Sequence, residues 1–214
     1  MCNAREEKIK RYLLVSVCLL MFNGCGEQQI QKAGFLSDYS KLQARSDTSL
    51  RYISMRDLSR YSKFIVDPVQ AHFHTGSKAI EKRTEGKLKQ EDLRDLQNYM
   101  HEAMVKALSD RYEVVSRPGP GVARVRVALT DFKKSEVILN ILPAAKVTGV
   151  GLGGASMEAE IIDSQTGKQI GALVELQRGS RLSLDGLSKW GDAKGVMDKW
   201  AQSLRKRVDE AHGY

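Results

Sequence analysis

Cys25 is the residue whose type and position point to the most specific chemistry in this sequence. It follows an eleven-residue apolar run, 12–22, which is entered through basic residues, and Asn23-Gly24 lies directly before its thiol. A basic start, an apolar stretch and small residues at the cut are typical of a bacterial lipoprotein signal peptide. We therefore predict cleavage between Gly24 and Cys25 and attachment of lipid to Cys25.

Three other interpretations of this N-terminus stay open, and each fits less well. A transmembrane helix needs about twenty apolar residues, but the run here has eleven. An ordinary secretory signal ends in an A-x-A-like pair of small residues, whereas Phe22 lies three residues before Cys25. An apolar helix of a cytoplasmic domain is at odds with the abrupt polar change at 26–29. Phe22 and Asn23 also depart from the usual lipoprotein pattern, but Gly24-Cys25 matches it.

A second candidate for chemistry is the pair His72 and His74. They flank Phe73, so on a strand both imidazoles would lie on one side and could share a metal ion. Two ligands do not make a metal site, and no clear third ligand lies nearby in the sequence. We therefore expect a surface pair and no metal centre.

The glycine-rich run 149–154 satisfies the G-x-G-x-x-G pattern of dinucleotide-binding sites, and Glu175 lies near the distance expected of a ribose-binding acid. Such a site requires a long helix after the glycines, because the helix N-terminus meets the pyrophosphate. The residues that follow instead alternate between apolar and polar up to Asp163, which is typical of a strand. We therefore expect no cofactor, and interpret the glycines as a flexible loop that could touch a partner or a membrane.

Hydrolytic chemistry has weaker support. His101 and His212 could each act as the general base for a serine nucleophile. However, no nucleophile-elbow pattern surrounds any serine. Members of a triad can be distant in sequence, so an envelope hydrolase is kept as an alternative, and no catalytic residue is assigned. Trp190 and Trp200 are interpreted as core or capping residues rather than as a platform for stacking sugars.

Removal of residues 1–24 would leave 190 residues, enough for one domain with its own core. The signal carries four basic and two acidic residues, so the formal charge would fall from +8 to +6. This basic surplus favours anionic envelope partners such as lipopolysaccharide, phospholipid headgroups or peptidoglycan, while the interspersed acids argue against nucleic acid. Cys25 would be the only cysteine left, so the domain could form no internal disulfide.

Apolar periodicity predicts two amphipathic helices, over 91–108 and 196–208, together with several short strands. Tight turns between consecutive strands favour antiparallel pairing. We predict a single α+β domain over 51–214 in the order β-α-β-β-β-β-α. Its sheet is expected to have about five strands, mostly antiparallel, with both helices packed on one face. The expected strands cover 64–69, 112–116, 123–130, 155–161 and 168–177.

Residues 25–50 are expected to join the lipid anchor to that domain. The polar stretch 26–32 suits a short tether. Phe35, Tyr39 and Leu42 are spaced to share one side of a short helix, which would dock this arm onto the domain. Residues 43–50 are polar, and this predicts a loop.

Several of these motifs together resemble one bacterial family. They are the segment 34–42, the turn 117–120 before an Arg-x-Arg strand, the segment 158–167 and the closing helix with Trp190 and Trp200. In order and spacing they are similar to the uncharacterised lipoproteins called domain of unknown function 3313. The resemblance covers nearly the whole mature chain and implies a periplasm-facing lipoprotein without an assigned activity, cofactor or catalytic residue.

Two expectations of function follow from these features. The first is a non-enzymatic accessory protein of the cell envelope, whose domain binds an envelope protein through a sheet edge or a loop. Gly26, rather than an aspartate, follows Cys25, which by analogy with other lipoproteins favours the outer membrane, facing the periplasm. The alternative is a binder or carrier of a lipid or a peptidoglycan fragment, favoured by the apolar stretch 137–152 and the basic surplus.

Overall fold

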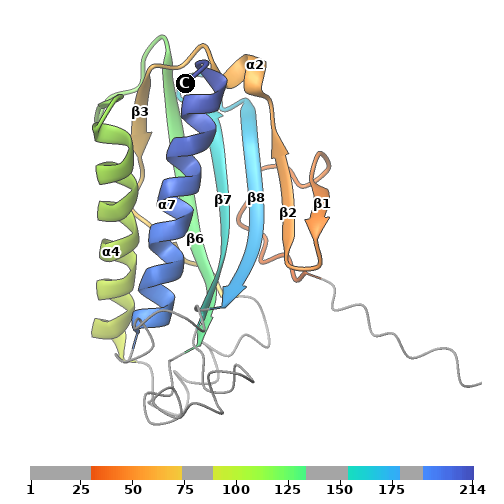
Figure 1. Cartoon of the computed structure of the whole chain (residues 1–214), viewed down its shortest axis with the longest axis vertical. Coiled ribbons are helices and arrows are strands. Elements are labelled where there is room, and N and C mark those ends of the chain that lie inside the picture. The colour runs from red at the N-terminus through yellow and green to blue at the C-terminus, as the bar shows by residue number, and fades with distance from the viewer. Residues whose placement is uncertain (1–29, 74–88, 134–153, 179–189) are drawn as a thin grey trace, which may run out of the picture.

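The computed structural model describes residues 30–73, 89–133, 154–178 and 190–214 (Figure 1). They form one mixed sheet with two long helices along one face, which confirms the predicted α+β class. In chain order the elements are β1 (Gln43–Ser46), β2 (Ser49–Ile53), α2 (Met55–Leu58), β3 (Lys63–Val66), β4 (Gln70–Ala71), α4 (Gln90–Ser109), β5 (Glu113–Val114), β6 (Val122–Lys133), β7 (Gly154–Asp163), β8 (Gln169–Arg178) and α7 (Gly191–Ala211).

The strands follow the order β1-β2-β8-β7-β6-β3-β5 across the sheet, and β4 pairs with β6 beside β3. The long antiparallel centre, β6-β7-β8, is the part that alternating apolar residues predicted. Between β7 and β8 the chain reverses at Gly167, whose φ of 72° favours glycine. Asp163 Oδ1 accepts hydrogen bonds from the N–H groups of Gln165 and Thr166 and holds this turn.

The sheet contains more parallel pairing than expected. β3 lies parallel to both β5 and β6, and β4 is also parallel to β6. Helix α4 carries the chain back to the end of the sheet where β3 began, so the strands before and after it point the same way. The described residues form an eight-stranded mixed sheet, and the prediction of about five mostly antiparallel strands was wrong in these details.

Strands β1 and β2 were missed entirely at the sequence level. Residues 43–50, predicted as a loop, form β1 and the start of β2, and β2 pairs antiparallel with β8. All four residues of β1 are exposed at the sheet edge, so the apolar alternation that identifies a half-buried strand is absent. The partner of β2 lies far away in the sequence, and local propensity gives no sign of that pairing.

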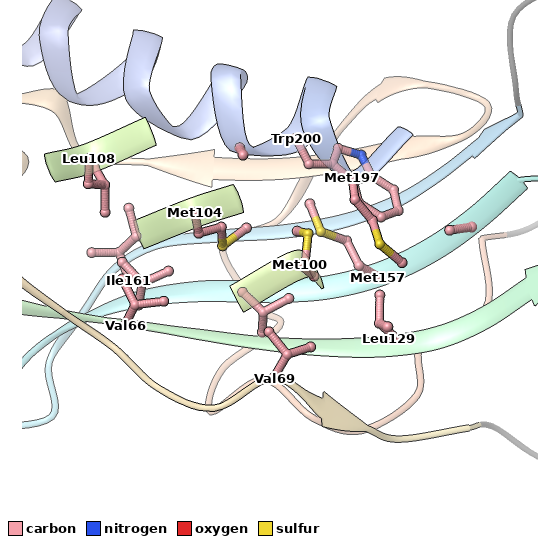
Figure 2. Close-up of a cluster of buried hydrophobic side chains, with 14 of the residues drawn as sticks. Val66, Val69, Met100, Met104, Leu108, Leu129, Met157, Ile161, Met197 and Trp200 are labelled. Carbon is pink, nitrogen blue, oxygen red and sulfur yellow. The ribbon is translucent and has the colours of Figure 1, made fainter. Parts of the chain in front are cut away.

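The main core lies between the sheet and the two predicted amphipathic helices, which the structure confirms as α4 and α7 (Figure 1). Figure 2 shows part of this core, in which Met100, Met157 and Met197 gather around the ring of Trp200. Burial of apolar surface contributes roughly 25 cal/mol per Å² and is the main force holding the layers together. The largest fully buried side chains are Leu58, Phe64, Leu96, Met100, Met104, Leu108, Leu129, Met157, Ile170, Met197 and Trp200.

Polar contacts fasten the two helices to each other at both ends. Arg205 of α7 donates to the backbone oxygen of Ala107 at 2.9 Å and to Asp209 at 2.9 Å, and Tyr112 Oη donates to Asp209 at 2.7 Å. Burial opposes ionisation of Asp209, but the hydrogen bonds from Arg205 and Tyr112 outweigh it and lower the pKa of this carboxyl. At the other end, Trp190 Nε1 donates to Asp92 at 3.1 Å.

Candidate functional site

Residues 30–42, called the N-terminal arm below, pack on the sheet face opposite the helices (Figure 1). Phe35 and Leu36 are buried against small and branched side chains of β6 and β8, and Tyr39 and Leu42 pack beside them. The arm is an irregular segment, so the predicted short helix was wrong. The same apolar residues nevertheless face the sheet, because Gly34, with a φ of 92°, allows a bend that a helix would not.

Glu158 of β7 holds the first half of the arm. Its side chain is fully buried, and it accepts hydrogen bonds from the N–H groups of Ala33 at 2.5 Å and Phe35 at 2.9 Å and from the hydroxyl of Tyr39. All three partners are hydrogen-bond donors of the arm. The arm alone therefore satisfies the buried carboxylate of Glu158. A buried charge is tolerated only when hydrogen bonds or opposite charges compensate it.

Glu160, two residues further along β7, holds the second half of the arm on the same face. Arg126 Nη1 lies 2.5 Å from its carboxylate, and Gln169 Nε2 donates at 2.9 Å. The N–H and hydroxyl of Ser37 donate to the same oxygen at 3.0 and 2.7 Å. Glu158 and Glu160, with the arm donors that they bind, are called the latch below.

The latch joins two segments that the sequence motifs already singled out, 34–42 and 158–167. The alternation along β7 was recognised in the sequence, and in it Glu158 and Glu160 share the polar side of the strand. The arm covers that face, so both carboxylates are buried. The two carboxylates that accept hydrogen bonds from the arm both lie on β7, so one strand positions the arm on the sheet.

Tyr39 makes arm docking sensitive to alkaline pH. Burial, followed by the hydrogen bond to Glu158, raises the pKa of Tyr39 from 10 to about 12. Because the folded pKa is raised, the stabilisation is complete below pH 10 and is lost as the pH rises toward 12. We expect Tyr39→Phe to flatten the decline of the melting temperature between pH 9 and pH 12 relative to the unaltered protein. An equally steep decline in both proteins, measured by circular dichroism, would contradict this assignment.

A second feature lies on the helix side of the sheet, beside α7. Here β2 and β8 extend past the helix, and an apolar depression of about 90 Å³ lies between them. Its floor is formed by Ile53, Gly171 and Leu173, and its wall by Trp200 and Leu204. We call it the α7 groove.

The rim of the α7 groove is charged. Arg51 of β2, Glu175 of β8 and Arg207 of α7 all line it. Arg207 Nη1 pairs with Glu210 at 2.7 Å, whereas Arg51 has no ion-pair partner among the described residues. The groove therefore combines an apolar floor with a rim of mixed charge, in which Arg51 is the cation without an ion-pair partner among the described residues.

The residues singled out for chemistry in the sequence do not converge in the described structure. Cys25, Gly24, His74 and the glycines 149–153 lie outside the described residues. His72 is exposed and packs its ring against Phe35 of the arm, at 6.1 Å between centroids.

The rings of His101 and His212 each contact a main-chain oxygen through Nδ1. His101 Nδ1 lies 3.2 Å from the oxygen of Asp67, and His212 Nδ1 lies 2.8 Å from that of Val208. Within the four described segments, no three His, Cys, Asp or Glu side chains are grouped to hold a metal ion. In those same segments no helix is both long and apolar enough to cross a membrane.

The sequence matches the family model described as "Protein of unknown function (DUF3313)" over residues 31–204. The chain belongs to this family. The resemblance drawn from the motifs is thereby confirmed, and the matched residues include the latch and all of the α7 groove except Arg207. A comparison with curated proteins finds no match.

Solved structures of similar architecture include PelC from Paraburkholderia phytofirmans, which is a dodecamer, at 12% identity and a TM-score of 0.44, covering 77% of this chain and 96% of PelC. Protein XCC0632 from Xanthomonas campestris follows at 10% identity and a TM-score of 0.39, covering 70% and 87%. A protein from Caulobacter crescentus CB15, provisionally described as a lipoprotein, has 9% identity and a TM-score of 0.34, covering 75% and 96%.

Proposed function

We propose that this DUF3313 protein is a lipid-anchored, non-enzymatic accessory protein of the cell envelope that binds another envelope protein. The observation that carries the proposal is the latch, because it immobilises the chain directly after the predicted lipid attachment site. The arm thus packs as part of the folded domain, and only a short tether separates the domain from the predicted anchor.

The latch sets how far the domain can move from the membrane. Eight residues from Cys25 to Ala33 span at most about 29 Å, whereas the eighteen residues from Cys25 to Gln43, the start of β1, would span about 65 Å. With the arm docked, the reach of the tether is therefore less than half of what it would otherwise be. A protein that works by binding a partner close to the membrane gains from this restriction.

A binding role also agrees with the state of the polar groups. The buried carboxylates Glu158 and Glu160 are occupied by the arm, and the rings of His101 and His212 are held by backbone oxygens. General acid or base catalysis needs a titratable group within hydrogen-bond reach of a substrate. These four groups, the strongest candidates among the described residues, are engaged in holding the fold.

The anchoring half of the proposal is tested by mass spectrometry of protein extracted from membranes. We expect a mature chain that begins at Cys25 and carries the added mass of acyl chains, and we expect Cys25→Ser to remain unprocessed and without lipid. Density-gradient separation of the membranes is expected to place the acylated protein in the outer membrane. A mature N-terminus at any other residue would overturn the anchoring assignment.

The binding half is tested separately by amine-reactive crosslinking in intact cells. We expect the lipid-anchored protein to give one reproducible adduct with an envelope protein. An absence of any reproducible adduct would count against partner binding while leaving the anchoring result untouched.

The alternative of a lipid or peptidoglycan carrier has less support from the described residues. The apolar stretch 137–152 that favoured it lies outside them. The α7 groove, at about 90 Å³, has the volume of roughly three water molecules at about 30 Å³ each. This is too small for an acyl chain, while sites for small molecules commonly measure about 300–1,000 Å³.

A further inference from the structure

The sheet is wider than the two helices that cover it. Neighbouring strands lie about 4.8 Å apart, so the seven strands of the main path span about 29 Å, while two helices cover about 20 Å. Figure 1 shows α4 and α7 over the β3, β6 and β7 side, with β8 and β2 continuing past α7. Among the described residues, neither long helix covers a strip about one helix wide on the helix side of β8 and β2.

The α7 groove lies in this strip and has the shape of a hole for a side chain. Gly171 forms part of the floor, and a Cβ atom there would lie 3.4 Å from Ile53 Cγ1. The missing side chain at this position deepens the floor between Ile53 and Leu173. A volume of about 90 Å³ suits one branched aliphatic side chain, as in the knobs-into-holes packing of helices.

The charges of the rim limit the occupant further. Arg51 has no ion-pair partner among the described residues, whereas Arg207 is paired with Glu210 at 2.7 Å. Glu175 accepts a hydrogen bond from Gln177, so its carboxylate is partly engaged within β8. Arg51, the rim cation without an ion-pair partner among the described residues, favours a partner with a carboxylate beside an apolar stripe.

We propose that the α7 groove binds an amphipathic helix of an envelope protein, which lies beside α7 across β8 and β2. One aliphatic side chain of that helix enters the hole over Gly171, and an acidic side chain pairs with Arg51. Helices that bury one apolar face in a groove are a common mode of recognition. This inference rests on the proposed partner-binding function and assigns it a location and a partner chemistry.

The test uses the full-length, lipid-anchored protein in intact cells. Ser203, an exposed residue of α7 at the groove, is replaced by the photo-crosslinking amino acid p-benzoylphenylalanine. We expect one protein adduct, and we expect mass spectrometry of the crosslinked peptide to place the contact in an amphipathic helix that carries an acidic residue. The same amino acid at Glu102, exposed on α4, is expected to give no such adduct.

Substitutions in the groove give the specificity control. Arg51→Glu and Leu173→Glu are each expected to reduce the yield of the Ser203 adduct at least about tenfold, the equivalent of about 1.4 kcal/mol. Arg51→Lys, which keeps the charge, is expected to retain most of it. Thermal melting by circular dichroism verifies that each variant is folded, and Arg51 is suited to this comparison because it lies on the rim and not in the core.

Several outcomes would overturn the proposal. They are adducts at Ser203 with lipid or with a second copy of this chain, a contact outside an acidic amphipathic helix, or an adduct yield that Arg51→Glu leaves unchanged. If amine-reactive crosslinking captures a partner but Ser203 does not, the groove assignment fails and the proposed function stands. If neither method captures a partner, both fail.

Discussion

Replacing Glu158 by alanine is expected to release the N-terminal arm and to lower the free energy of unfolding by about 3 kcal/mol. The N–H groups of Ala33 and Phe35 and the hydroxyl of Tyr39 would all lose their acceptor in a water-poor environment. Phe35 and Leu36 would then leave the sheet face together with these donors. Guanidinium titration measures the loss of stability, and trypsin cleavage after Lys41 measures release of the arm.

Two further variants separate the latch from a general loss of a carboxylate. Glu158→Gln keeps the size of the side chain but replaces one acceptor by a donor, so it is also expected to release the arm. Glu102→Ala removes an exposed carboxylate on α4 and is expected to change stability by less than about 0.5 kcal/mol. A Glu158→Ala protein whose arm resists trypsin as well as the unaltered protein does would show that the apolar contacts alone hold the arm.

Replacing Trp200 by alanine is expected to cost about 3–5 kcal/mol of unfolding free energy. Only 2% of Trp200 is exposed, and its ring packs with Met157 and Met197 between α7 and the sheet (Figure 2). The truncation would leave a cavity that two helices and a sheet cannot close without moving. Guanidinium titration followed by the fluorescence of Trp190 measures this loss.

Trp200→Phe provides the matched comparison. Trp200 Nε1 is buried and has no hydrogen-bond partner among the described residues, so phenylalanine removes a desolvated donor while it keeps most of the ring. We expect it to cost clearly less than the alanine variant. Leu176→Ala, at a side chain that is 40% exposed, is expected to be nearly neutral. Equal losses for the Ala and Phe variants would contradict the cavity explanation.

Many helices and strands of the domain could be predicted because they depend on local sequence patterns. The stripes that include Leu96 and Met104 in α4, and Met197 and Trp200 in α7, repeat at three and four residues, and each helix appeared near its predicted bounds. The alternation along β7 and β8, with the turn at Asp163–Gly167, was equally local. Family membership followed from several such motifs in a fixed order.

Other elements depended on partners far away in the chain. The exposed strand β1 has no apolar pattern, and β2 is defined by pairing with β8. The parallel arrangement of β3 follows from the path of the chain through α4, which residue patterns do not encode. Glu158 and Glu160 have the composition of a solvent-facing strand side, and only the arm above them turns that side into a buried one.

The sequence by itself determined the helices, the central hairpin, the family and the prediction of lipid at Cys25, because each depends on neighbours within a few residues. Only the tertiary structure decided where the arm docks, how Glu158 and Glu160 are used, and that β2 and β8 extend past α7. These features arise where segments distant in sequence meet. The burial of a residue, its hydrogen-bond partners and the surface left uncovered depend on contacts between distant segments. The sequence of one segment therefore does not reveal them.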